Sequence, residues 1–243
     1  MQKPILIAFL LLASGSAYSA TGAHWGYSGA EGPENWVRLS PDYSACSGKN
    51  QSPIDLTGLV EADLEPIQFA YEAGGGEILN NGHTVQVNCA PGSTIEVDGH
   101  VFELNQFHFH VPSENRIEGK SFPMEAHLVH RDKDGNLAVV AVMLGEGAPN
   151  PALEAAWAKM PAKEGDKHAL TEAVSAESLL PANRDHYRFN GSLTTPPCTE
   201  GVWWLVMKQP VSASKEQIER FANVMHHANN RPLQPVNARP VLQ

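Results

Sequence analysis

The stretch Gln106-Phe107-His108-Phe109-His110 predicts a β-strand that carries two histidines two positions apart. Successive side chains of an extended strand point to opposite faces, so His108 and His110 share one face. A second run, Glu125-Ala126-His127-Leu128-Val129-His130, also favours a strand and supplies a third imidazole. If the two strands pair, the three side chains converge and leave a fourth position open. That ligand count is typical of a catalytic zinc site, whereas a structural site is usually closed by four protein ligands.

The residues beside the histidines favour a metal site over the ordinary alternative. A lone histidine on a strand is more often a polar surface or packing residue than a ligand. Here Gln106 shares the face of His108, and Glu125 shares the face of His127. A zinc-bound imidazole needs an acceptor for its second N–H, which amide and carboxylate oxygens supply. His130 falls on the opposite face from His127, so we expect a surface or packing role for it.

Two further polar residues complete a mechanism. Thr194 lies in the proline-stiffened loop Ser192-Leu193-Thr194-Thr195-Pro196-Pro197, and Glu114 follows the first histidine pair. A threonine hydroxyl can accept the proton of a zinc-bound hydroxide while donating its own to a buried, ionised carboxylate. Glu114 would therefore orient Thr194 and would not act as a base. Alone, the loop is ordinary and Glu114 is a surface charge; the functional interpretation depends on their occurrence together with the histidines.

Several motifs in order along the chain resemble the alpha-class carbonic anhydrases of the bacterial, secreted type. The resemblance covers nearly the whole chain after its first residues, and so many ordered motifs do not coincide by chance. Besides the histidine runs and the threonine loop, the motifs are His24-Trp25-Gly26-Tyr27, Asn50-Gln51-Ser52-Pro53-Ile54-Asp55, Asn80-Asn81-Gly82-His83 and Asn230-Arg231-Pro232-Leu233-Gln234.

The resemblance implies an enzyme that reversibly hydrates carbon dioxide to bicarbonate and a proton at a Zn²⁺ ion. Apolar residues suit a pocket for a weakly polar substrate, although each would equally suit an ordinary core. By role, the implied residues are the zinc ligands His108, His110 and His127; the hydroxide-orienting pair Thr194 and Glu114; the hydrogen-bond partners of the ligands, Gln106, Glu125 and a backbone carbonyl near Asn229; the substrate pocket of Val129, Val139, Leu193, Thr195 and Trp204; and the water-ordering residues Tyr27, Asn81 and Thr195.

Proton export needs a group that titrates near neutrality. His83 matches the proton shuttle of the family, and an unperturbed imidazole with a pKa of about 6.5 suits the task. The alternative is a plain turn, because Asn81-Gly82 is a strong hairpin signal and the residue after it needs only to be polar. We favour the shuttle.

Two other functions are compatible with parts of the pattern. A non-catalytic zinc-binding or ligand-binding module could use the same fold, but such members typically lack a zinc histidine, and this chain keeps His108, His110 and His127. A zinc hydrolase of esters or peptides could use the same chemistry. Metallopeptidases usually carry His-Glu-x-x-His, and this motif does not occur in the sequence.

The first residues predict export. Lys3 precedes an apolar run over 5–13, which is too short to span a membrane and has the length of a signal-peptide core. The small residues Ala17 and Ser19 predict cleavage after Ser19, which leaves a domain of residues 20–243 in the periplasm or outside the cell. The chain holds 27 acidic and 17 basic residues, and its formal net charge of −10 argues against nucleic acid as a partner. The sequence shows no second apolar stretch that would predict a membrane anchor. A homodimer is an expectation by family analogy alone.

The three cysteines are Cys46, Cys89 and Cys198, so at least one is unpaired or joins another chain. Sequence alone permits three pairings. The resemblance favours Cys46 with Cys198, which would pin the loop that carries Thr194. Cys89 ends an alternating strand and reads as a small buried hydrophobic residue. It departs from the two cysteines expected of the family, which leaves an intermolecular role open.

The fold expected is mainly β and a single domain. Strands are predicted over 84–89, 94–97, 101–109, 125–130 and 137–144, with glycines between them. Helices are few: one over 151–160 begins after Asn150 with a proline, and one begins at Ser214, which forms a capping box with Gln217. The resemblance adds a large twisted, mostly antiparallel central sheet with short peripheral helices.

Overall fold

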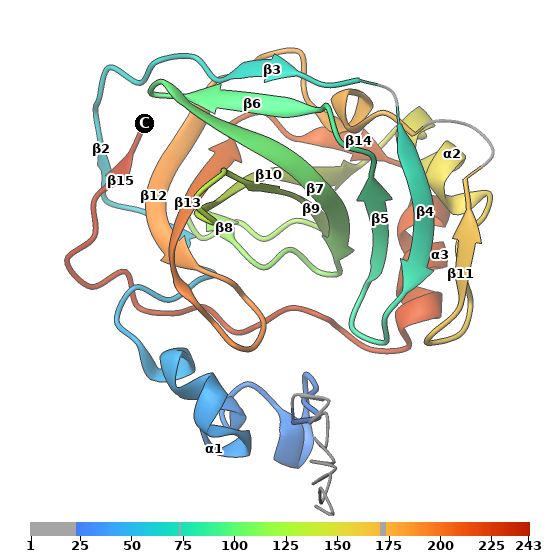
Figure 1. The fold of residues 1–243 in the computed structure, drawn as a ribbon, viewed down its shortest axis with the longest axis horizontal. Helices are drawn as coiled ribbons and strands as arrows, with labels where there is room; N and C mark the ends of the chain where they lie inside the picture. The colour runs from blue at the N-terminus through green and yellow to red at the C-terminus, as the bar shows by residue number, and fades with distance from the viewer. Residues whose placement is uncertain (1–22, 73, 171–173) are drawn as a thin grey trace, which may run out of the picture.

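A computed structural model of the protein describes residues 23–72, 74–170 and 174–243. The expected leader and its cleavage site, residues 1–19, lie outside these residues. The described chain is mainly β, as predicted, with short helices around one large sheet (Figure 1).

The large sheet contains 13 of the strands that the structure describes. Its main path runs in the order β11-β4-β5-β7-β9-β10-β13-β12-β15-β2; β6 and β14 pair with β7 and β10, and β3 pairs with β6. The strand bounds are β2 Leu59–Val60, β3 Gln68–Ala70, β4 Gly75–Asn80, β5 Val85–Cys89, β6 Thr94–Val97, β7 His100–His110, β9 Met124–Arg131, β10 Leu137–Glu146, β11 Lys167–Ala169, β12 His186–Ser192, β13 Glu200–Met207, β14 Val211–Ala213 and β15 Val241–Leu242. A separate parallel pair joins β1 (Asp55–Leu56) to β8 (Arg116–Ile117).

The expectation of a mostly antiparallel sheet is confirmed. Within the large sheet, only β10 with β13, β10 with β14 and β15 with β2 pair in parallel among the described strands. Figure 1 shows β7 and β9 crossing the centre of the molecule. These two strands are antiparallel neighbours, and their register places His108 opposite His127. The pairing on which the predicted histidine cluster depended is therefore present.

The sheet separates two apolar cores because its strands alternate their side chains. Phe107 and Phe109 of β7 belong to the core beneath the helices, whereas His108 and His110 point to the other face. That second face carries the core around Val139 and Trp204. Side-chain alternation thus fixes which face receives the histidines, because a shift of one residue would bury them among the aromatic residues instead.

Two helices cover the first face, and both begin where they were predicted to begin. α2 (Pro151–Trp157) begins where the Asn150 side chain accepts from Ala152 N and Leu153 N. Its predicted end at Met160 is three residues too late, because hydrogen bonds of the tighter i to i−3 kind follow Trp157 and Pro161 disfavours further helix.

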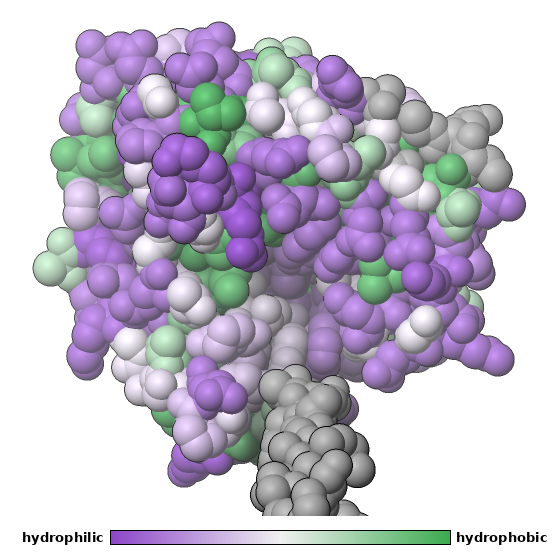
Figure 2. Space-filling model, viewed as in Figure 1, coloured by the Kyte–Doolittle hydropathy of each residue, from purple (hydrophilic) through white to green (hydrophobic). Residues whose placement is uncertain are grey.

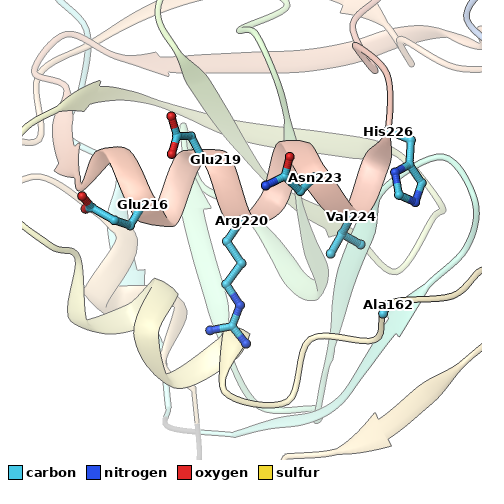
Figure 3. A pocket seen from close by; sticks show the side chains of 7 residues that line it. All are labelled: Ala162, Glu216, Glu219, Arg220, Asn223, Val224 and His226. Atoms are coloured by element: carbon cyan, nitrogen blue, oxygen red, sulfur yellow. The ribbon is translucent and has the colours of Figure 1, made fainter.

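The predicted capping box is confirmed in α3 (Lys215–Met225), with Ser214 and Gln217 bonded reciprocally. Figure 3 shows Arg220 extending from α3 away from the helix axis, and its guanidinium donates to the Trp157 carbonyl of α2 at 2.6 Å. Phe109 packs edge-on against Trp157 and Phe221, with ring centroids 6.1 and 6.0 Å away, so both helices hold the strand that carries the histidines.

The remaining helices are short, and all but η3 precede the first strand in the sequence. They are η1 (Gly29–Glu31), α1 (Trp36–Leu39), η2 (Pro41–Ser47) and η3 (Ala176–Leu179).

The visible face of the molecule is mainly hydrophilic, with small separate hydrophobic areas (Figure 2). Large exposed hydrophobic side chains are few among the described residues, namely Val37, Val60, Val101 and Leu233. Within the same residues, no helix has the length and hydrophobicity that a membrane crossing requires.

A disulfide joins Cys46 of η2 to Cys198 of the loop between β12 and β13, as the resemblance implied. Its two residues are 152 positions apart. Backbone groups around the bridge are also bonded: Gln51 donates to the Cys198 carbonyl at 3.1 Å, and Cys198 N donates to the Thr195 carbonyl at 2.8 Å. Cys89 is a free, half-buried thiol, and burial raises its pKa to about 12. The bridge ties the N-terminal segment to the loop that carries Thr194.

Removing the disulfide should destabilise the protein. Cys46→Ala with Cys198→Ala should lower the free energy of unfolding by about 2 to 5 kcal/mol, because a bridge across so long a loop restricts the unfolded chain. Denaturant unfolding followed by tryptophan fluorescence measures the change. Cys89→Ala is the matched control and should cost much less. Equal losses in the two variants would show that the bridge contributes no specific stability.

Candidate functional site

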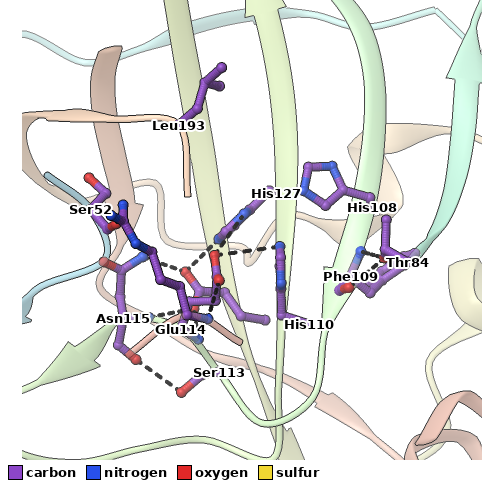
Figure 4. A network of polar contacts seen from close by, with 12 residues as sticks. Ser52, Thr84, His108, Phe109, His110, Ser113, Glu114, Asn115, His127 and Leu193 are labelled. Carbon is purple, nitrogen blue, oxygen red and sulfur yellow. Dashed lines mark hydrogen bonds and ion pairs between the residues drawn. The ribbon is translucent and has the colours of Figure 1, made fainter. Parts of the chain in front are cut away.

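Three histidines from two neighbouring strands form the one group of three or more side chains among the described residues that could hold a metal ion. His108 and His110 come from β7, and His127 comes from β9. One nitrogen from each lies within 4.8 Å of the others. His110 and His127 are buried, and His108 is half-buried. Figure 4 shows the three imidazoles turned toward one space between the strands.

The outer nitrogen of each imidazole has a fixed acceptor. His108 Nδ1 lies 2.8 Å from Gln106 Oε1, and His127 Nε2 lies 2.9 Å from Glu125 Oε1. His110 Nδ1 lies 2.7 Å from the Asn229 carbonyl. Carbonyl and carboxylate oxygens only accept, so each of these nitrogens carries the proton. The structure brings together the partners that were expected, including the backbone carbonyl at Asn229.

The inner nitrogens are therefore unprotonated, and each carries a free lone pair. They are Nε2 of His108, Nε2 of His110 and Nδ1 of His127. His110 Nε2 is buried and has no hydrogen-bond partner in the protein. Burial lowers the pKa of His108 and of His110, and at His108 the neighbouring charges of His110 and His127 lower it further. Neutral imidazoles with converging lone pairs are the state that a metal ion requires, so these residues fit a bound metal.

Glu125 is a fully buried carboxylate whose oxygens are saturated with donors. Besides His127, it accepts from Glu114 N at 2.7 Å, from Asn115 N at 2.8 Å and from the Asn115 side-chain amide at 2.7 Å. Burial raises the pKa of Glu125, but His127 and the hydrogen bonds outweigh burial and hold that pKa below its ordinary value. Glu125 is thus a stable anion that fixes the orientation of His127.

Glu114 is equally buried but only partly satisfied. Its Oε1 accepts from Arg231 N at 2.8 Å. Its Oε2 has no hydrogen-bond partner in the protein and lies 3.6 Å from His110 Nε2 and 3.9 Å from His127 Nδ1. Figure 4 shows this carboxylate facing both rings. Burial raises the pKa of Glu114 to about 7, while His127 and hydrogen bonds from Arg231 and Thr194 act to lower it.

Thr194 is buried and lies close enough to Glu114 for its side chain to hydrogen-bond the carboxylate. The predicted pair is therefore brought together at the histidines. Thr195 is half-buried in the same loop, and its carbonyl accepts from Cys198 N.

The predicted apolar residues form a continuous wall beside His127. Val129, Val139 and Trp204 are aligned across β9, β10 and β13, because Val139 pairs with both of the others. The Trp204 ring stands edge-on to His127, with centroids 4.9 Å apart. Leu193 follows β12 and packs against the same core. These four residues lie on the same face of the sheet as the three histidines.

His83 lies at the end of a side-chain-stabilised turn. Asn81 Oδ1 accepts from His83 N at 3.0 Å and from Thr84 N at 2.8 Å, so the Asn81 side chain shapes the turn. The half-buried His83 imidazole stacks on Trp25, with ring centroids 3.7 Å apart. Burial lowers the pKa of His83, and Glu164 acts in the opposite direction. The Trp25 contact could not be expected from the sequence, because 58 positions separate the two residues.

Tyr27 lies near Glu114 and near Trp25, the residue on which His83 stacks. Burial raises the pKa of its hydroxyl, and the charge of Glu114 raises it further. Its ring centroid is 6.0 Å from that of His227 and 5.5 Å from that of Trp25.

Sequence reasoning missed the central part that the Asn229 side chain plays. Its amide donates to the carbonyls of His83 at 3.0 Å and Phe109 at 2.9 Å, and its Oδ1 accepts from Val111 N at 2.8 Å. Its own backbone carbonyl holds His110. Asn229 therefore joins the turn that carries His83 to β7, the strand that carries His108 and His110. Its place beside the motif Asn230-Arg231-Pro232 was the available signal.

Arg231 was also missed as part of the site. Its buried guanidinium donates to Gln51 Oε1 and the Ser52 carbonyl at 2.8 Å each, and to the Cys46 carbonyl at 3.2 Å. Since its backbone N–H holds Glu114, Arg231 links that carboxylate to the segment beside the disulfide.

Comparison with known proteins agrees with this geometry. A family model described as eukaryotic-type carbonic anhydrase matches residues 31–243. The chain belongs to the alpha carbonic anhydrase family. A carbonic anhydrase of Pectobacterium carotovorum is 49% identical over 243 residues and is covered over 100% of both chains. One of Neisseria gonorrhoeae is 47% identical, with 99% of this chain and 97% of the relative covered.

Among solved structures, the alpha-carbonic anhydrase of Thermovibrio ammonificans in complex with the inhibitor sulfanilamide is similar at a TM-score of 0.90. It shares 52% sequence identity, over 91% of this chain and 100% of that one. The expectation of an enzyme of the carbonic anhydrase class is confirmed by these similarities over the full length.

Removing the Asn229 side chain should destabilise the fold. Asn229→Ala leaves the Val111 N–H and the His83 carbonyl without this partner, while the Phe109 carbonyl still accepts from the Thr84 hydroxyl at 2.6 Å. Each lost partner costs about 1 to 3 kcal/mol, so we expect a total of about 3 kcal/mol. Chemical denaturation measures the change in the free energy of unfolding. Asn223→Ala, at an exposed position of α3, is the control and should be near neutral. A loss at Asn229 no larger than at Asn223 would contradict the central part assigned to this amide.

Proposed function

We propose that the protein catalyses the reversible hydration of carbon dioxide to bicarbonate and a proton at a zinc ion held by His108, His110 and His127. The observation that carries this proposal is the convergence of three imidazole lone pairs, one of them on a buried nitrogen without any partner. Family membership supports the same reaction.

Three imidazoles with an open fourth position match the donor set of catalytic zinc. Zinc bound there would lower the pKa of a coordinated water to about 7, a value for which carbonic anhydrase is itself the reference example. Gln106, Glu125 and the Asn229 carbonyl keep the three rings oriented for that role.

Thr194 and Glu114 orient the nucleophile. Glu114, held by Arg231 N, would accept a hydrogen bond from the Thr194 hydroxyl and stay ionised. The Thr194 oxygen is then left as an acceptor, so the nucleophile would donate a hydrogen bond to it and keep a lone pair directed toward the substrate. This role needs Glu114 ionised. Burial opposes that form and raises the pKa of Glu114 to about 7, while His127 and the hydrogen bonds from Arg231 and Thr194 offset part of this effect.

The apolar wall of Val129, Val139, Leu193 and Trp204 binds carbon dioxide. A weakly polar molecule gains little from hydrogen bonds, and apolar side chains keep water from its place. Val139 and Trp204 are almost fully buried, while Val129 and Leu193 are half-buried and border the accessible side.

His83 exports the proton. Its backbone is fixed by Asn81 and Asn229, while its imidazole is only half-buried and so meets solvent. Burial lowers the pKa of this ring from its ordinary value, and Glu164 offsets part of that effect. Tyr27, Asn81 and Thr195 are proposed to order water between the metal position and His83.

We further propose that the chain is exported to the periplasm after cleavage of residues 1–19, and that residues 20–243 form the mature enzyme. The disulfide between Cys46 and Cys198 supports an oxidising compartment.

Paired substitutions at the site should separate metal binding from catalysis. His127→Ala should weaken zinc binding by more than about 100-fold, because removing a ligand costs more than removing the hydrogen-bond partner of a ligand. Activity should fall with zinc binding. Thr194→Ala should keep one zinc per chain and lose about 100-fold in turnover, because only the orienting group is removed. Zinc analysis and stopped-flow hydration on the same samples measure both.

His100→Ala is the control for these variants, since this exposed histidine begins the same strand β7. It should retain zinc and activity. Full activity of the Thr194 variant would refute the orienting role, and full zinc binding by the His127 variant would refute the ligand set.

Replacing His83 should slow proton export and leave the preceding chemistry intact. His83→Ala should lower kcat in a poor buffer by about tenfold or more, with kcat/KM unchanged, because export follows the conversion of substrate. Added imidazole should restore part of kcat by carrying the proton instead. Stopped-flow kinetics at several buffer concentrations test this, and the absence of any rescue would mean that the proton leaves by another route.

A further inference from the structure

The carboxylate of Glu164 lies beside the turn that carries His83. Glu164 belongs to the loop between α2 and β11. A Cβ added to Gly82 would stand 2.6 Å from the Glu164 carboxyl carbon, so this carboxyl lies directly against the backbone of the residue that precedes His83. A side chain at position 82 would displace it.

The loop that carries Glu164 is fixed at three points to one buried residue. Asn80 donates through its backbone N–H to the Asp166 carbonyl at 3.1 Å and through its side chain to the Pro161 carbonyl at 3.4 Å. Its own carbonyl accepts from Gly165 N at 2.8 Å. Asn80 begins the turn that ends at His83. The loop with Glu164 and the turn with His83 are therefore held together by the same residue.

We propose that Glu164 is a positioning residue for proton export, holding a carboxylate beside His83 that stabilises the imidazolium formed when His83 takes up the proton. This inference rests on the proton-export role of His83 proposed above. The proton stays on His83 until solvent or buffer removes it, and Glu164 accepts no proton.

The electrostatics agree with this geometry. Burial lowers the pKa of His83; Glu164 is the group that raises it, and His24 and His227 lower it. These three come from the loop before β11, the N-terminal segment and the segment after α3. Gly82, Glu164 and His227 line one surface hollow, which also contains Lys163. Without Glu164, burial and two neighbouring imidazoles would act on His83 unopposed.

The other acidic residues near this loop are not among the charges that shift the His83 pKa. The hollow shown in Figure 3 adjoins that of Glu164, since both are lined by Ala162, Val224 and His226. Its acidic residues, Glu216 and Glu219, project from α3 and are not among the groups that act on His83. Asp166 lies in the same loop as Glu164, but it is not among the charges that shift the His83 pKa.

The test compares Glu164→Gln with Asp166→Asn in the zinc-loaded enzyme. Both changes remove one negative charge from the same exposed loop. NMR titration of the His83 imidazole should show a lower His83 pKa in Glu164→Gln and no change in Asp166→Asn. In a poor buffer, Glu164→Gln should lose about two- to fivefold in kcat for hydration, the size expected of one exposed charge pair, with kcat/KM unchanged. High salt should shrink this difference by screening the pair.

An unchanged His83 pKa in Glu164→Gln, or an equal fall in Asp166→Asn, would overturn the inference. Failure of the proton-export role itself is seen separately, as the absence of buffer rescue in His83→Ala. The NMR titration does not depend on that role, so the two failures are distinguishable.

Discussion

The orientation of three imidazole rings is the constraint on which the site depends. Each ring gives its outer N–H to an oxygen that can only accept, so each must turn a lone pair inward. Gln106 and Glu125 achieve this locally, since each stands two residues before its histidine on the same strand. Asn229 acts from a distant segment that packs against the end of β7. Were any ring free to flip, the lone pairs would no longer converge, whatever the strand pairing.

Two buried carboxylates, Glu125 and Glu114, lie beside the histidines, and their pKa values are shifted in opposite directions. Glu125 is saturated with donors and has a lowered pKa, so it remains a fixed anion behind His127. Glu114 keeps one oxygen without a partner, and burial raises its pKa to about 7. A buried anion left incompletely bonded is costly and persists only where surrounding charges and hydrogen bonds favour it. Arg231 supplies one of those bonds and connects Glu114 to the segment held by the disulfide between Cys46 and Cys198. The long loop closed by that bridge thus also supports the catalytic geometry.

Local patterns predicted much of this structure, and long-range contacts account for what they could not. Strand parity placed His108 and His110 on one face and His130 on the other, because the period of a strand is fixed by its backbone. The helix at Ser214 followed from its capping box. By contrast, the hydrogen bonds of the Asn229 side chain and of Arg231 span more than a hundred residues, and no local period encodes them. The end of the helix over 151–160 was placed too late for a different, local reason: the backbone hydrogen bonds after Trp157 change to the tighter i to i−3 kind before Pro161.

The most direct test of the account is stopped-flow carbon dioxide hydration by purified residues 20–243, with zinc content determined on the same sample. We predict rapid hydration at one zinc per chain, lost on chelation and restored by zinc, because the three inward lone pairs of His108, His110 and His127 supply the ligand set. A folded protein with one zinc per chain and no hydration activity would contradict it. That result would leave a metal-binding module, or a hydrolase with another substrate, on the same fold.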